Sequence, residues 1–205
     1  MCPPPGPYLL IISNMLLQVC TMLFLLLKDN LLRQTAADVL LGLCSRKVHL
    51  AADSEQFVQF MLQDEALKMV FSIFEETCAA ALSDEAVLFL KTLCRIYTNL
   101  GDNHLSSVLR NSLTVPKESF QKYLQLMLIF YQNPLISIRY IAVDLWVHFL
   151  TFDHVTNSED MITLIPHLVS ATQKYFCKPL PDSTNEDMFD YCEVGRGVVY
   201  SKFEF

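Results

Sequence analysis

Glycine is scarce in this sequence, with five residues in 205, and tryptophan occurs only once. A β-rich fold needs many glycine-containing turns and a collagen-like chain needs periodic glycine, so this composition argues against both classes. Hydrophobic residues make up 52% of the chain, which excludes a disordered protein. The length suffices for one large domain or for several stacked helix pairs with a shared core.

Basic charge is also sparse and is not concentrated anywhere. The 15 lysines and arginines are scattered without a block of five or more, and the net charge is −7. This segment therefore lacks the electrostatic footprint of a nucleic-acid-binding domain. The seven cysteines include no Cys-x-x-Cys pair, and four of them fall within apolar helical patterns. Such cysteines are typical of a reducing compartment.

Motifs that carry catalysis are missing. The sequence contains no Gly-x-Ser-x-Gly and no phosphate-binding glycine-rich loop, and Gly195-Arg196-Gly197 is too short for a dinucleotide fingerprint. Arg46 and Lys47 follow Cys44 and could lower the pKa of its thiol. A buried cysteine at a helix end, followed by cations that favour the helix dipole, is the better interpretation. We expect no enzyme, no catalytic residue and no cofactor.

The five histidines, at positions 49, 104, 148, 154 and 167, do not form a metal-binding pattern. His148 and His154 flank an expected helix end, and no cysteine or carboxylate cluster completes a set of four ligands. We interpret His148 as a packed or half-exposed residue and His167, which follows Pro166, as structural. No metal site is predicted.

The chain has one long apolar run, from Tyr8 to Leu27, and a mean hydropathy of +0.31. A run of this length could cross a bilayer, which keeps a small helical membrane protein as one alternative. No lysine or arginine precedes the run, and Ser13, Asn14 and Gln18 interrupt it. We therefore favour a buried helix of a helical array and expect no membrane insertion.

Helical periodicity continues through most of the chain, which predicts an all-α fold. We divide the chain into an irregular, proline-rich leader at residues 1–8, a helical array at 9–176 and an acidic loop or tail at 177–205. Eight helices are expected in the array, at residues 9–27, 30–45, 54–81, 84–100, 103–113, 117–132, 135–151 and 158–176.

Residues typical of helix ends separate these segments. Short polar side chains accept hydrogen bonds at helix starts, proline fits the first turn, and glycine suits a C-terminal cap. The predicted N-caps are Asp29, Asp53, Ser83, Asp102 and Ser158, the first-turn prolines are Pro116 and Pro134, and the predicted C-cap is Gly101.

Two of the predicted helices share a spacing. Each carries an arginine, then an alanine three residues later, an aspartate five later and a large apolar residue seven later, starting at Arg33 and at Arg139. The alanine allows a neighbouring helix to approach closely, and the arginine can reach the adjoining repeat. This is the second-helix pattern of HEAT repeats. The sequence therefore predicts an α-solenoid of antiparallel HEAT-type helix pairs, with about four repeats.

Several stretches resemble, in order along the chain, an interior part of the exportin-5 family of nuclear export receptors, within the importin-β superfamily. They are residues 23–47, 89–97, 120–124, 164–168 and 200–205. The similarity runs from about residue 15 to residue 205 and covers part of the amino-terminal half of such a receptor. Residues 1–14 depart from the family pattern, and Val194 to Val199 reads as an insertion.

The resemblance implies a function that composition does not show. Receptors of this family wrap structured small RNA and protein cargo together with Ran-GTP, carry them from the nucleus to the cytoplasm, and release them on GTP hydrolysis. Nucleoporins are further implied partners. A HEAT scaffold that binds only protein partners is the alternative. The resemblance implies no particular RNA or Ran contact residue in this chain.

Two groups of charged residues are the candidates for such contacts. The acidic segment from Asp182 to Glu193 is interpreted as a solvated loop, with an electrostatic contact to a basic partner as the functional alternative. Basic residues could touch phosphate if they share one face. These are Arg33, Arg46, Lys47, Arg110, Lys117, Lys122 and Arg139.

Overall fold

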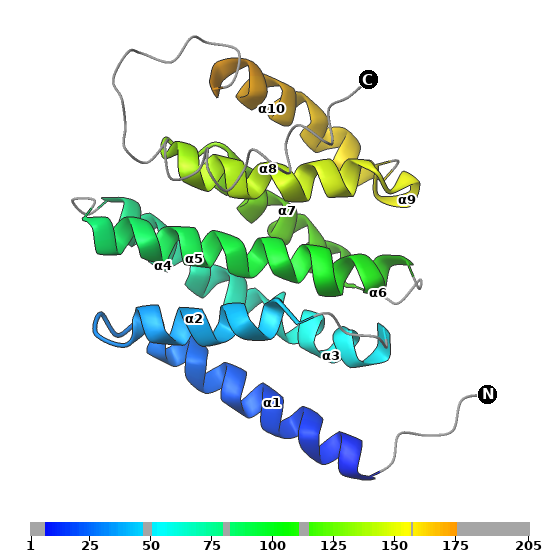
Figure 1. Cartoon of the computed structure of the whole chain (residues 1–205). Coiled ribbons are helices and arrows are strands. Elements are labelled where there is room, and N and C mark those ends of the chain that lie inside the picture. Colours follow the sequence, from blue (N-terminus) through cyan, green and yellow to red (C-terminus); the bar gives the residue numbers. More distant parts are fainter. Residues whose placement is uncertain (1–6, 47–50, 80–82, 111–114, 157, 176–205) are drawn as a thin grey trace. The chain divides into compact units, whose positions relative to one another are not determined.

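The structure is a computed structural model that describes residues 7–46, 51–79, 83–110, 115–156 and 158–175. The regular elements in these ranges are all helical, so the predicted all-α class is confirmed (Figure 1). The elements are α1 (Pro7–Leu26), α2 (Arg33–Cys44), α3 (Ala51–Met61), α4 (Asp64–Ala79), α5 (Asp84–Leu100), a π-helical turn η1 (Gly101–Leu105), α6 (Ser106–Arg110), α7 (Lys117–Tyr131), α8 (Ile136–Leu150), α9 (Asp153–Thr156) and α10 (Glu159–Tyr175).

The chain forms two compact units, residues 1–127 and 128–205. In the first unit α2 packs against α5, while α3 packs against η1 and α6 (Figure 1). These segments form two neighbouring lines of helices, and α1 and α4 pack against α2 and α5, respectively. In the second unit α9 contacts both α8 and α10. The number of repeats remains a prediction, and so does the division of the chain into a leader (1–8), a helical array (9–176) and a tail (177–205).

Two predicted caps are confirmed. The Ser83 hydroxyl accepts a hydrogen bond from the Ala86 amide (3.2 Å) at the start of α5, and the Ser158 hydroxyl accepts one from the Met161 amide (3.3 Å) before α10. Each satisfies one of the amides that a helix start leaves without an intrahelical partner. Pro116 directly precedes α7, and Pro134 lies in the turn before α8.

Three predicted N-caps are wrong: Asp29, Asp53 and Asp102, the last of which lies inside η1. Asp53 lies inside α3, not before it. The Asp29 carboxylate accepts from the Leu31 amide (2.8 Å) and closes a turn, and α2 begins only at Arg33. An aspartate can bond its own backbone two residues ahead as readily as it caps a helix, and the sequence does not distinguish the two.

The single helix predicted over residues 54–81 is in fact two helices, α3 and α4. The chain turns at Leu62 and Gln63, and the new helix starts with Asp64 and Glu65, which favour the N-terminal dipole. The apolar pattern hides the break because it continues in phase across it. Leu62 itself is buried, so the turn is anchored in the core rather than marked by glycine or proline.

The predicted helix end at Gly101 is also wrong. Gly101 has right-handed helical angles (φ −61°, ψ −51°), and the chain continues through η1 into α6, with Asp102 inside the turn instead of capping a new helix. Contacts from η1 account for the continuation. The Asn103 side-chain Nδ2 donates to the Cys44 carbonyl (3.0 Å) at the end of α2, and the ring centroid of His104 lies 5.0 Å from that of Phe57 in α3.

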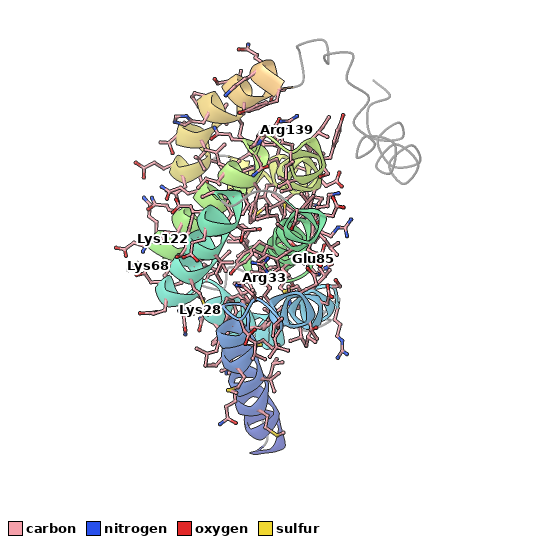
Figure 2. All side chains as sticks on the ribbon, turned by 90° about the vertical axis from the view of Figure 1, so that its left-hand side faces the viewer. Lys28, Arg33, Lys68, Glu85, Lys122 and Arg139 are labelled. Atoms are coloured by element: carbon pink, nitrogen blue, oxygen red, sulfur yellow. The ribbon has the colours of Figure 1, made fainter. Side chains whose placement is uncertain are left out.

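The arginine spacing acts as the sequence predicted. The Arg33 guanidinium lies 4.8 Å from the Phe89 ring centroid in α5, and that of Arg139 lies 4.6 Å from the Tyr175 ring centroid in α10 (Figure 2). Each arginine therefore reaches from its own helix to a later one, where a cation over an aromatic face is stabilising. The alanines of the pattern, Ala36 and Ala142, are buried.

The buried alanine in α2 provides a test of the packing against α5. Replacing Ala36 by leucine forces extra volume into a close helix contact, and we expect a loss of about 1–3 kcal/mol of unfolding free energy, measured by chemical denaturation. The matched control is Thr35→Leu at the neighbouring exposed position, which should change stability by less than about 0.5 kcal/mol. Equal effects of the two substitutions would contradict the packing.

The buried His104 predicts a dependence of stability on pH. Burial lowers the pKa of His104 below its ordinary value of 6.5, although its hydrogen bonds to the Leu43 and Cys44 backbone act in the opposite direction. The unfolded chain then binds more protons than the folded one just below pH 6.5, so stability falls as the pH falls through this region. Thermal unfolding of the wild type and of His104→Gln should show a smaller acid loss in the variant; identical pH profiles would refute this assignment.

Candidate interaction surfaces

Three of the predicted basic candidates are held by contacts within the chain. Arg33 stacks on Phe89 and its Nη1 donates to the Asn30 side chain (3.3 Å). Lys122 of α7 binds the Asp64 carboxylate of α4, which also accepts from Lys68 (2.5 Å). These bonds, that from Lys122 first, lower the pKa of Asp64. The cations thus fasten neighbouring helices to one another.

Arg139 is the clearest case of a structural cation. Its side chain is 6% exposed, and its Nη1 donates to the carbonyls of Asn133 (2.9 Å) and Pro134 (3.0 Å). Those carbonyls belong to the turn that precedes α8. Burial lowers the pKa of Arg139. The side chain therefore ties the turn, α8 and the end of α10 together within the second unit.

The remaining basic candidates are exposed or lie outside the described residues. Arg46 and Lys117 are exposed, at the end of α2 and the start of α7. Lys47 and the side chain of Arg110 lie outside the described residues, as does the acidic segment from Asp182 to Glu193. Whether the exposed basic residues contact phosphate stays a prediction.

Cys44, His104 and His148 are packing residues, whereas His49 and the side chain of His154 lie outside the described residues. Cys44 is buried, and burial raises the pKa of its thiol, which is the opposite of activation. The His148 ring packs edge-on against Phe152 (4.7 Å between centroids). His167 differs from its prediction, because it is exposed on α10. Across the described residues, no group of three or more His, Cys, Asp or Glu side chains could hold a metal ion.

Helix α1 carries an exposed apolar stripe, which was not predicted from the sequence. Met15, Val19, Met22 and Leu25 recur at helical spacing and are 60%, 48%, 59% and 54% exposed. The signal in the sequence is that α1 contains no charged residue. On α10, Ile162 and Val169 are similarly exposed. Exposed apolar faces of this kind mark surfaces that bind other chains or neighbouring repeats.

The first unit also contains a pocket of about 450 Å³ where the end of α1 meets α4 and the start of α5. We call it the α1–α4 pocket. Its lining is mixed, with four apolar residues, four uncharged polar residues and three charged side chains, those of Lys28, Arg33 and Glu76. The sequence analysis missed it because its walls come from helices that are far apart along the chain.

Helices packed against one another within each unit and arginines that bridge neighbouring helices define a protein of the all-α solenoid class. Within the described residues, no helix is both long enough and apolar enough to span a membrane.

Comparison with known proteins gives the particular family. The family model for the exportin-5 family matches residues 84–194, which is more than half of the chain. Human exportin-5 is 25% identical over 184 residues, a match that covers 89% of this chain and 14% of the human protein. The chain belongs to the exportin-5 family, and it spans only a small part of the length of this relative.

The structural role of Arg139 can be tested against that of an exposed arginine. Replacing Arg139 by alanine removes the charged donor from the carbonyls of buried Asn133 and of Pro134, so we expect a loss of roughly 1.5–3 kcal/mol of unfolding free energy. Arg46→Ala is the matched control and should stay within about 0.5 kcal/mol of the wild type. Denaturant titration measures both. A stable Arg139→Ala variant would show that this cation is not needed by the fold.

Proposed function

We propose that this chain is part of a nuclear export receptor that binds structured small RNA and protein cargo together with Ran-GTP. Its family membership is the observation that carries the proposal. The architecture supports it, because a stack of helix pairs offers a long surface on which cargo and a GTPase can be bound at once. The proposed activity is binding and transport rather than catalysis, and the proposed localisation is shuttling between nucleus and cytoplasm.

This segment contributes to the receptor mainly as a scaffold. Its best-placed cations, Arg33, Lys122 and Arg139, bind helices and turns of the chain itself. Counterion release from phosphate, the main source of RNA affinity, needs cations that are available to the ligand. We therefore place the principal RNA contacts of the receptor outside the described part of this chain.

A second candidate is a HEAT scaffold that binds only protein partners, nucleoporins among them. Two observations favour it: the net charge of −7 and the apolar faces of α1 and α10. Protein interfaces bury apolar surface at their centres, whereas nucleic-acid interfaces are strongly basic. The two candidates differ in whether RNA binding by the receptor depends on the nucleotide state of Ran.

A chimera tests the proposal. The segment of human exportin-5 that aligns with this chain is replaced by the chain, and binding of a short hairpin RNA is measured by fluorescence anisotropy with Ran loaded with a non-hydrolysable GTP analogue or with GDP. We expect tight binding only with the GTP analogue, and weaker binding as salt increases.

Two controls make the result interpretable. A chimera with Leu93→Asp, which places a charge in the buried core of α5, should lose binding because the scaffold unfolds. Unmodified human exportin-5 sets the expected affinity. RNA binding that is equal with GDP and the GTP analogue would reject the export proposal, and a folded chimera that binds Ran but no RNA would favour the protein-only scaffold.

A further inference from the structure

The α1–α4 pocket lies between elements of two successive helix pairs. Lys28 follows α1, Arg33 opens α2, and Met69, Ile73 and Glu76 lie along α4. Its volume of about 450 Å³ falls within the range of sites that hold a small ligand or one or two side chains. Figure 2 labels Lys28 and Arg33 where the end of α1 approaches α2 and α4.

The floor of the pocket is apolar. Leu27 and Ile73 are buried residues of the core that also line the pocket, and Met69 beside them is half-buried. Methionine adapts to ligands of different shape because its side chain is unbranched and flexible. An apolar group that enters the pocket would therefore be removed from water against a surface that can adjust to it.

The polar side chains of the pocket are partly held in place. Arg33 has one face on the Phe89 ring and one nitrogen bonded to Asn30, so its guanidinium is fixed before any ligand arrives. Such preorganisation lowers the entropic cost of binding. Glu76 is also positioned, because its carboxylate accepts a hydrogen bond from Ser72 (2.7 Å). Lys28 is exposed and mobile enough to follow a ligand charge.

We propose that the α1–α4 pocket binds an extended acidic segment of a partner protein through one large apolar side chain and a neighbouring carboxylate. The apolar side chain lies on Leu27, Met69 and Ile73, and the carboxylate lies between Arg33 and Lys28. A backbone amide of the same segment donates to Glu76. The inference does not depend on RNA export, since it concerns a peptide site within the first unit.

Nucleic acid fits this pocket less well than a peptide. A phosphodiester backbone offers acceptors near the pocket but no donor, so the Glu76 carboxylate would face a phosphate of like charge. A peptide carries both amide donors and carboxylate acceptors. It can therefore bind the Glu76 carboxylate and the cations Lys28 and Arg33 at the same time. The apolar floor likewise matches a leucine-like side chain better than a solvated sugar-phosphate.

The test uses the full 205-residue chain and a fluorescein-labelled synthetic peptide, acetyl-Leu-Glu-Leu-Glu-Glu-Leu-amide, followed by fluorescence anisotropy. We expect saturable binding that weakens with salt and is lost when glutamine replaces the peptide's glutamates. Lys28→Glu should weaken binding by about tenfold or more, because it turns an attraction into a repulsion. Glu76→Ala should also weaken binding, because the backbone amide of the peptide loses its acceptor.

The matched control is Arg46→Glu, which makes the same charge change at an exposed site at the far end of α2. It should keep the wild-type affinity, and circular dichroism confirms that each variant is folded. Equal loss in Lys28→Glu and Arg46→Glu would mean that only net charge is sensed and would overturn the proposal. The proposal would also be overturned if Lys28→Glu abolished the binding of a labelled hairpin RNA but did not weaken the binding of the peptide.

Discussion

The structure depends above all on the lateral contact between second helices of neighbouring pairs. In the first unit this contact is the packing of α2 against α5. Buried alanines on α2 keep the two helices close, and Arg33 reaches over the Phe89 ring at the end of the contact. Because a helix pair alone cannot bury its apolar face, this contact turns separate pairs into one core. The π-helical turn η1 extends it by binding the end of α2 and the ring of Phe57 in α3.

The same constraint explains why Arg33, Lys122 and Arg139 are held by contacts within the chain. Arginine and lysine near the ends of helices are within reach of the neighbouring layer, and there they find aromatic rings, carboxylates and turn carbonyls. Once a side chain is held in this way, binding a phosphate would first require breaking an internal contact. In the described part of the chain, the exposed apolar faces of α1 and α10 and the α1–α4 pocket are among the surfaces open to partners.

Sequence reasoning located most helices because apolar residues at three- and four-residue steps report directly which face is buried. It found α5 with its Ser83 cap, α7 and α8 within a residue or two of their ends, and it predicted the bridging role of Arg33 and Arg139. It failed at Gly101 and at Leu62. Glycine often ends a helix, but contacts of η1 with α2 and α3 keep this one going. The turn at Leu62 carries no breaker, and its buried side chain continues the pattern of α3.

The sequence alone determined the all-α class, the layered helix pairs and the relation to exportin-5, because periodicity, small residues and ordered similarity are properties of the chain read along its length. Tertiary structure alone decided where the charged residues act. Lys122 meets Asp64, Arg139 meets Tyr175, and Lys28 shares a pocket with Glu76, although each pair is distant in sequence. The reason is physical: the partner of a long charged side chain is set by distance in space, and linear spacing reports that distance only within a single helix.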